Sequence, residues 1–292
     1  MKTYHDIVGD GGSNILEQVA EQKDRIGRAL SQVKHRVAVG SGKGGVGKST
    51  VTRALASAVA SRGLKVAIVD ADFNGPTQAR MTGLQGAMPV PGVDGMIALP
   101  KSRDGVGVFS VGAFLPESEA LNFASVSTGE SHTWRATKEF AALGEVLASV
   151  TWGKLDVLLF DLPPGAERTL QFAEYLGPET SFLLVTIPSE VSRGVVARSV
   201  AALARTENPV LGYVENMSGY LCPDCGSVKP LFPEVKDGIV LDLPCLGRVP
   251  FDPALAFACD RGVSFVDLPE TAATRALSAI AGRLVETLES AR

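Results

Sequence analysis

Six short apolar runs, rich in β-branched residues, follow one another along the chain and constrain its fold more than any other feature. They are residues 37–39, 65–70, 107–111, 156–161, 182–187 and 210–215. Most are apolar at every position rather than at alternate positions, which is typical of parallel strands buried on both faces. Several are separated by segments of helical composition, such as residues 48–63. The sequence therefore predicts an α/β fold: a doubly wound, mostly parallel sheet between two layers of helices.

The segments on either side of these runs predict additional elements. Residues 13–34, from Ile15 to Val33, carry apolar side chains close to helical spacing among charged ones, which predicts an amphipathic helix outside the main domain. We therefore divide the chain into an N-terminal helical extension, residues 1–34, and a main domain, residues 35–292. Residues 84–130 are rich in Gly, Pro and Ser and are expected to form loops and short elements.

Charge and hydropathy exclude several classes of protein. The net charge of -4 and the pI near 5.5 argue against general binding to nucleic acid or to anionic membranes. The first residues lack a basic segment followed by an apolar one, and no long uncharged apolar run occurs. The amphipathic C-terminal segment, residues 271–292, has no Trp or Phe and is a poor membrane anchor, so we expect it to dock on the sheet. We expect a cytoplasmic protein that binds neither nucleic acid nor, stably, membranes.

The glycine-rich stretch SGKGGVGKST, residues 41–50, lies between the first apolar run and a predicted helix. Its spacing satisfies the P-loop pattern, in which backbone N–H groups and a helix N-terminus bind phosphates. Lys48 is expected to reach the β and γ phosphates of ATP, and the Ser49 hydroxyl to ligate Mg²⁺. The alternative, a glycine-rich turn without a ligand, does not explain this context. The predicted nucleotide-binding residues here are Gly42, Gly44, Gly45, Val46, Gly47, Lys48, Ser49 and Thr50.

A second lysine, Lys43, occupies the same loop but sits too early in it to duplicate the contact of Lys48. The arrangement GKGGVGKS resembles the deviant Walker A motif of the MinD/ParA/Mrp class of P-loop ATPases. In that class the early lysine reaches across a dimer interface to the phosphates bound by the other subunit. The resemblance implies that Lys43 is catalytic in a nucleotide-sandwich homodimer, much as an arginine finger supplied in trans is. The alternative is a solvated surface lysine.

Carboxylates end two of the predicted strands. Asp70 and Asp72 follow one run and Asp161 ends a later one. Phosphoryl transfer needs one acidic group in the Mg²⁺ shell and another that orients the attacking water. The resemblance implies that Asp72 is the water-orienting residue of switch I. It also implies that Asp161 is the Walker B residue, which holds Mg²⁺ through water. Asp70 is expected to cap a turn or helix and so to support the loop.

The segment DLPPG, residues 161–165, resembles switch II of the Mrp subgroup, where Gly165 would approach the γ phosphate. That subgroup usually continues with threonine, glycine and aspartate, whereas this chain has Ala166, Glu167 and Arg168. The difference reverses one charge beside the reaction centre. We expect Arg168 to pair with a neighbouring acid, the alternative being an additional phosphate contact.

The four cysteines are unevenly placed. Cys222 and Cys225 form a CxxC pair, restrained by Pro223, whose thiolates can face one metal centre. Cys245 and Cys259 do not repeat the spacing, so a four-cysteine zinc site within one chain is disfavoured, and we expect these two to be buried structural thiols.

The stretch VENMSGYLCPDCG, residues 214–226, resembles the VENMS and CPxC signature of the Mrp/ApbC iron-sulfur carrier ATPases. DADFNGP at 70–76 and GRVPFDP at 247–253 resemble the same family. The resemblance implies that Asn216 hydrogen-bonds adenine, with a turn role as the alternative, and that Pro250 and Asp252 line the base pocket.

This second resemblance also implies a function. It implies an ATP-binding carrier, a homodimer that bridges one [4Fe-4S] cluster between two CPxC pairs, hydrolyses ATP slowly and exchanges the cluster with scaffold or apo-client proteins. Three other interpretations remain open: a MinD/ParA-like positioning ATPase with a structural zinc at the pair, a redox dithiol, and a nitrogenase-reductase-like electron donor. Liposome binding separates the first of these from the carrier.

Overall fold

The central sheet of the computed structural model has the strand order β10-β8-β7-β1-β6-β2-β5, all parallel, with β9 antiparallel on β8. The structure describes residues 15–92, 95–114, 132–233, 239 and 241–290. The strands are β1 (Val33–Ser41), β2 (Val66–Asp70), β5 (Gly107–Phe109), β6 (Leu155–Asp161), β7 (Thr180–Thr186), β8 (Val210–Leu221), β9 (Val228–Lys229) and β10 (Cys245–Phe251). A small antiparallel pair, β3 (Val90–Pro91) and β4 (Ile97–Ala98), lies apart from this sheet.

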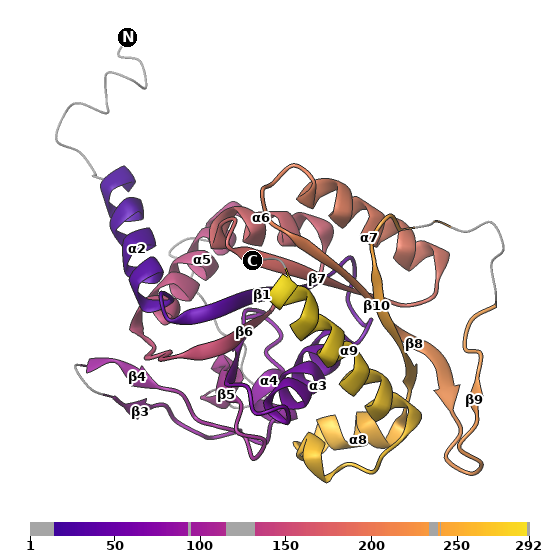
Figure 1. Ribbon diagram of the computed structural model, residues 1–292. Coiled ribbons are helices and arrows are strands. Elements are labelled where there is room, and N and C mark those ends of the chain that lie inside the picture. Colours follow the sequence, from indigo (N-terminus) through magenta and orange to yellow (C-terminus); the bar gives the residue numbers. More distant parts are fainter. Residues whose placement is uncertain (1–14, 93–94, 115–131, 234–238, 240, 291–292) are drawn as a thin grey trace.

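Helices cover both faces of the sheet, so the molecule has three layers (Figure 1). Successive residues of β1 point to opposite faces: Val37 and Val39 pack against α3 and α9, whereas Ala38 belongs to the core beneath α5, α6 and α7. The helices are α2 (Ile15–Ala29), α3 (Lys48–Ala60), α4 (Gln78–Met81), α5 (His132–Ser149), α6 (Ala166–Leu176), α7 (Glu190–Leu203), α8 (Pro253–Arg261) and α9 (Ala272–Ser290). The described residues also form two short 3₁₀ helices, η2 (Val111–Ala113) and η3 (Phe265–Asp267).

The predicted fold is confirmed, since all six apolar runs contribute to strands of the parallel sheet. The terminal helices also form: α2 packs on α5, and α9 packs on α3 and β10. The apolar face of α9 is buried through Leu277, Ile280, Leu284 and Leu288.

The predicted end of the N-terminal helix is wrong, because Val33 begins β1 instead of continuing that helix. Part of the loop-rich segment predicted at 84–130, residues 93–94 and 115–130, lies outside the described residues. No helix in the described ranges combines the length and apolar character of a membrane span.

Candidate functional site

The site forms where the parallel strands end, because their register places the loops that follow them at one edge of the sheet. Val39 of β1 and Asp70 of β2 both pair with Asp161 of β6. β1 continues into the glycine-rich loop, and α3 begins at Lys48 directly after it. The three motifs that the sequence predicts to act together, the P-loop and the segments after β2 and β6, therefore meet in space.

Two glycines of the P-loop are required by its geometry. Gly47 has φ of 80°, in the left-handed region, and a Cβ at this position would lie 2.2 Å from Nδ2 of Asn216. A Cβ on Gly42 would lie 2.6 Å from Cγ1 of Val195 on α7. The loop is thus packed between β8 on one side and α7 on the other.

We expect Gly47→Ala to displace both the loop and the Asn216 amide. The left-handed φ and the overlap with Nδ2 each oppose the added methyl group, and backbone strain of this kind costs about 1–3 kcal/mol. The free energy of unfolding should fall by that amount, and ATP affinity should fall at least about tenfold. Urea unfolding and nucleotide titration measure the two effects. Gly63→Ala is the control, since Gly63 also has positive φ but no atom lies within 4 Å of its added Cβ. Equal loss of ATP affinity in Gly47→Ala and Gly63→Ala would contradict the role of Gly47 in the nucleotide-binding loop.

Lys48 and Asp161 form the centre of a buried polar network. The Nζ of Lys48 lies 2.5 Å from Oδ1 of Asp161, with side-chain exposures of 7% and 0%. Lys48 also donates to Oγ of Ser49 at 3.3 Å, and Thr52 donates to the same Asp161 oxygen at 3.3 Å. A buried charge pair is stable only when its remaining polar atoms are satisfied. This network holds an ammonium group, a hydroxyl and a carboxylate together at the base of the P-loop.

Gln78, at the start of α4, is a member of this network that the sequence analysis missed. Its fully buried amide donates to Oδ2 of Asp161 at 2.8 Å and to the carbonyl oxygen of Ser49 at 3.0 Å. Its own Oε1 is buried and makes no hydrogen bond among the described residues. No sequence signal indicates this contact, because 83 residues separate Gln78 from Asp161.

Asp70 supports the loop after β2, as predicted. Its Oδ2 accepts hydrogen bonds from the backbone N–H groups of Thr77 and Gln78, each at 2.9 Å, and from the hydroxyl of Ser110 at 2.8 Å. Burial, and then the charge of Asp161, raise the pKa of Asp70 to about 7. The carboxyl group therefore fixes the start of α4 from a fully buried position.

Asp72 lies further along this loop and is less constrained. Its Oδ1 accepts the backbone N–H of Gly75 at 3.2 Å. Burial raises the pKa of Asp72, whereas the charge of Lys48 lowers it. A half-buried carboxylate within the field of the P-loop lysine is suited to orienting a polar molecule such as water.

Lys43 is half-buried in the loop, and its carbonyl oxygen accepts the Ser41 hydroxyl at 3.1 Å. Within the part of the chain that the structure describes, its ammonium group makes no ion pair. Lys43 and Lys48 thus differ: Lys48 is paired with Asp161, whereas Lys43 has no such partner in the described part of the chain.

The three residues predicted to contact the base lie on β8, β10 and the start of α8. Asn216 is buried and donates to the carbonyl oxygen of Val46 at 2.9 Å, so it is in contact with the P-loop. Pro250 is buried in β10. Asp252 caps α8 by accepting from the N–H groups of Ala254 and Leu255, and its second oxygen accepts the Thr271 hydroxyl. The base-binding role of all three remains a prediction.

The CPxC pair lies in the turn between β8 and β9, which projects from the sheet (Figure 1). The backbone of this turn is closed by hydrogen bonds from Cys222 N to Ser227 O at 2.9 Å and from Gly226 N to Cys222 O at 2.8 Å. Cys222 is half-buried and Cys225 is exposed. A hydrogen bond with the Ser227 hydroxyl is the first cause of a lowered pKa of Cys225, and one with the Cys222 thiol contributes as well. The two thiols therefore lie near each other in this one turn.

A groove of about 380 Å³ lies beside the turn, and Cys222 is the member of the pair that lines it. Its lining combines residues from the CPxC turn, the N-terminus of α8 and the segment before α9: Leu221, Cys222, Pro223, Asp252, Thr271 and Arg275. Among the described residues, no group of three or more His, Cys, Asp and Glu is placed to hold a metal ion. One chain thus offers a metal two thiolates at this position.

We expect Ser227→Ala to slow alkylation of Cys225. The thiolate is the reactive form, and losing the hydroxyl 3.0 Å from its sulfur raises the pKa of Cys225 and lowers the thiolate fraction. Iodoacetamide labelling of the reduced, metal-free protein at about pH 7.5, followed by mass spectrometry, should give a rate about two- to fivefold lower. Cys245, which is also exposed, is the internal control and should react at an unchanged rate. An unchanged rate at Cys225 would contradict the role of Ser227.

The other two cysteines differ from each other. Cys259 is buried in α8, as predicted. Cys245 is exposed, so its predicted burial is wrong. The reason is topological, because Cys245 begins β10, which is the last strand in the sheet order and pairs with no described strand on its outer side.

Arg168 pairs with an acid, as predicted. Its guanidinium group forms an ion pair with Glu139 of α5, and Glu139 also accepts a hydrogen bond from Asn74 Nδ2 at 2.7 Å. Glu139 is a second residue that the sequence analysis missed. It lies in none of the recognised motifs and reaches them only through tertiary packing.

Comparison with known proteins agrees with this geometry. The family model described as ParA, NUBPL iron-transfer P-loop NTPase, matches residues 32–285. The chain belongs to this family. It is 34% identical over 275 residues to an iron-sulfur cluster carrier protein of Methanocaldococcus jannaschii, an alignment that covers 93% of this chain and 91% of that protein. It is 36% identical over 264 residues to the cytosolic Fe-S cluster assembly factor NUBP2 of Bos taurus, covering 88% and 94%.

Solved structures show the same fold. A nucleotide-binding protein of Archaeoglobus fulgidus in complex with ADP superposes with a TM-score of 0.67 at 30% identity, covering 86% of this chain and 98% of that one. The cell division ATPase MinD of Pyrococcus furiosus superposes with a TM-score of 0.60 at 24% identity, covering 86% and 98%. This chain is therefore a P-loop NTPase of the NUBPL family, and its fold is shared with the MinD structure.

Proposed function

We propose that this chain is an ATP-dependent iron-sulfur cluster carrier that works as a homodimer. The observation that carries the proposal is the placement of Cys222 and Cys225 together in an accessible, hydrogen-bonded turn of a P-loop NTPase. Two thiolates are half the set that a [4Fe-4S] cluster takes, and a twofold axis beside the turn supplies the other half. The relatives named as iron-sulfur carrier and assembly proteins support the same cargo.

The residues at the base of the P-loop fit ATP and Mg²⁺. Ser49 and Asp161 offer the oxygen ligands that Mg²⁺ prefers, with Asp161 acting through water. Lys48 and the loop N–H groups bind the phosphates, and Asn216, Pro250 and Asp252 contact the base. Asp72 orients the attacking water, and Lys43 acts on the nucleotide of the partner subunit. Hydrolysis is slow and alters the geometry or release of the cluster.

The iron-sulfur cluster as cargo indicates which proteins this chain exchanges it with and in which compartment it works. The carrier exchanges its cluster with scaffold or apo-client proteins, and the groove beside Cys222 gives them access. NUBP2 is named a cytosolic factor, and we propose the cytoplasm for this chain as well, where thiols stay reduced.

Anaerobic reconstitution with iron and sulfide tests the proposal. We expect a chromophore absorbing near about 400 nm and about four irons per dimer, both lost in the Cys222→Ala, Cys225→Ala double variant. Cys245→Ala is the matched control, because it removes an exposed thiol outside the turn and should leave the chromophore unchanged. Tightly bound zinc without a chromophore would instead indicate a structural metal and favour a positioning ATPase.

A further inference from the structure

Glu139 joins the two loops that flank the proposed reaction centre. It lies on α5 with 8% exposure. Its Oε1 accepts from Asn74 Nδ2 at 2.7 Å, and its Oε2 pairs with the guanidinium group of Arg168. Asn74 follows Asp72 by two residues in the loop after β2, and Arg168 follows Gly165 by three in the first turn of α6. The Glu139 carboxylate on α5 therefore connects the loop after β2 to the segment that follows β6.

Arg168 is held firmly in this position. Its guanidinium carbon lies 5.5 Å from the centre of the Phe140 ring and 5.4 Å from that of Phe172. A third contact, the hydrogen bond to Gln171 Oε1 at 3.0 Å, fixes the plane of the group. Two aromatic faces and two polar partners leave the side chain little rotational freedom. The loop after β6 is thus attached to α5 through a rigid cation.

Asn74 lies between two other anchors of its loop. Asp72 accepts the N–H of Gly75, and Asp70 accepts the N–H groups of Thr77 and Gln78. The bond to Glu139 connects the middle of this loop, through Arg168, to the first turn of α6, whereas the start of the loop is connected to β6 by the bond from Ala71 N–H to the carbonyl oxygen of Asp161 at 2.9 Å. A displacement of the loop by about 1 Å would misplace the Asp72 carboxylate, and such displacements typically cost about 100-fold in rate.

We propose that Glu139 is a positioning residue for ATP hydrolysis. Through its contacts with Asn74 and Arg168, it fixes the position of Asp72 relative to the loop after β6. This rests on the proposed function, in which Asp72 orients the attacking water. The proposal also accounts for Arg168, which stands where the Mrp subgroup usually has aspartate. The negative charge of Glu139 compensates the positive charge of Arg168.

Steady-state ATP hydrolysis tests the positioning role in Glu139→Ala, Arg168→Ala and the control Glu145→Ala. Glu145 lies on the same helix, is exposed and pairs with Arg25, so the control removes the same charge outside the bridge. We expect kcat to fall at least about tenfold in the first two variants, with KM for ATP changed less than about twofold. Glu139→Gln keeps an acceptor for Asn74 and should recover part of the loss. An unchanged kcat, or an equal loss in Glu145→Ala, would overturn the proposal.

Hydrogen exchange separates this proposal from the proposed function. In the nucleotide-free protein, the amides of residues 72–77 should exchange faster in Glu139→Ala and Arg168→Ala than in the wild type or Glu145→Ala. If the wild type does not turn over ATP, the proposed hydrolysis is refuted. Faster exchange in Glu139→Ala and Arg168→Ala would still establish that Glu139 connects the two loops. Equal exchange in all four proteins would refute the bridge itself.

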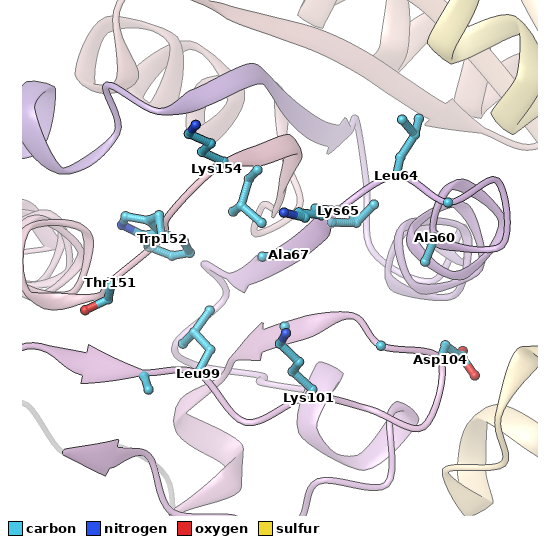
Figure 2. Close-up of a pocket in the computed structure, with 16 residues that line it drawn as sticks. Ala60, Leu64, Lys65, Ala67, Leu99, Lys101, Asp104, Thr151, Trp152 and Lys154 are labelled. Atoms are coloured by element: carbon cyan, nitrogen blue, oxygen red, sulfur yellow. The ribbon is translucent and has the colours of Figure 1, made fainter. Parts of the chain in front are cut away.

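A different observation concerns a cavity of about 540 Å³ at the opposite edge of the sheet, where β2, β5 and β6 begin. Figure 2 shows Lys65 and Lys101 pointing into it from opposite sides, with Trp152 and Leu99 beside them and Lys154 at the rim. The Trp152 N–H donates to the carbonyl oxygen of Leu147 inside the protein, so the indole offers the cavity an apolar surface.

Lys65 and Lys101 are exposed at this cavity, and the nearby Asp156 carboxylate accepts the backbone N–H of Lys65 at 2.8 Å. Among the described side chains, no carboxylate forms an ion pair with Lys65, Lys101 or Lys154. The one acidic residue of the lining, Asp104, is paired with the buried Arg53. Two ammonium groups therefore face an apolar wall in a space of the size that small-molecule sites have.

We infer that this cavity binds a small organic anion, with its carboxylate or phosphate between Lys65 and Lys101 and its apolar body against Trp152. The anionic dye 1-anilinonaphthalene-8-sulfonate is the probe, followed by fluorescence titration. The cavity variant carries two substitutions, Lys65→Gln and Lys101→Gln. The control variant carries Lys23→Gln and Lys229→Gln, which remove the same charge at exposed positions outside the cavity.

The wild type and the control pair should bind one dye per chain, and the cavity variant should bind it at least about tenfold more weakly. Octanoate and octyl phosphate serve as competitors, and the one that displaces the dye identifies the head group. Equal affinity in both double variants, or no displacement by either competitor, would overturn the inference.

Discussion

Replacing Lys43 by alanine is expected to reduce ATP turnover by at least about 1,000-fold while changing the affinity for ATP less than about threefold. In the proposed function the phosphates are bound by the loop N–H groups and by Lys48, whose ammonium group pairs with Asp161 in this structure. Lys43 makes no ion pair among the described residues, so its replacement by alanine breaks no ion pair in that part of the chain. Turnover and nucleotide titration measure the two quantities. Lys23→Ala, an exposed lysine on α2, is the control.

The role in trans has a sharper test, in which two inactive variants are mixed. A Lys43→Ala subunit binds ATP but lacks the catalytic lysine, whereas a Lys48→Ala subunit fails to bind ATP but still carries Lys43. A mixed dimer has one complete site, so equal amounts of the two should recover about a quarter of the wild-type turnover. No recovery would show that Lys43 acts within its own subunit, and full activity of Lys43→Ala alone would show that it is a surface lysine.

The sequence predicts the parts of this fold that are local. Each apolar run becomes a strand because burial on both faces of a parallel sheet leaves a signature within a few residues. The P-loop is equally local, since its glycines and Lys48 lie in one turn. β10 was missed because Gly247 and Pro250 interrupt its apolar pattern, and its position at the edge explains the exposed Cys245.

The contacts that complete the site are not local and could not be predicted in the same way. Gln78 reaches Asp161, and Glu139 reaches Asn74 and Arg168, across long stretches of chain. Which side chains meet there depends on the strand order and on where α4 and α5 pack, and neither is encoded in the spacing of the motifs. The motifs therefore identified the phosphate and thiol chemistry, while the residues that position these groups required the fold.

The second large effect that we expect is on stability, from Asp104→Ala. The Asp104 carboxylate is 1% exposed and lies 3.4 Å from the guanidinium group of Arg53, which is 2% exposed. Asp104 also accepts hydrogen bonds from the hydroxyls of Ser57 and Ser264. Removing one member of a buried ion pair leaves the other charge uncompensated, which costs about 3–5 kcal/mol. Urea unfolding should show this loss in the free energy of unfolding.

Arg53 connects three parts of the chain, which is why the loss should be global rather than local. From α3 it donates to the carbonyl oxygens of Met81, at the end of α4, and of Val263, after α8. Burial lowers the pKa of Arg53, and the charge of Asp104 raises it. Without Asp104, the guanidinium group keeps its burial and loses its counter-charge. We therefore expect a single cooperative transition at lower urea concentration, not an early unfolding of one segment.

Arg103→Ala is the matched control, because it removes the neighbouring ion pair in the same loop. Arg103 is 76% exposed and pairs with Asp267, and pairs of this kind contribute at most about 1 kcal/mol. The double variant Arg53→Met, Asp104→Ala removes both charges and should be destabilised by less than the sum of the single variants, since no isolated charge stays buried. Strict additivity would mean that the two charges do not stabilise one another. The loss in Asp104→Ala would then come from the hydrogen bonds that Asp104 accepts from Ser57, Ser264 and the backbone N–H of Phe265.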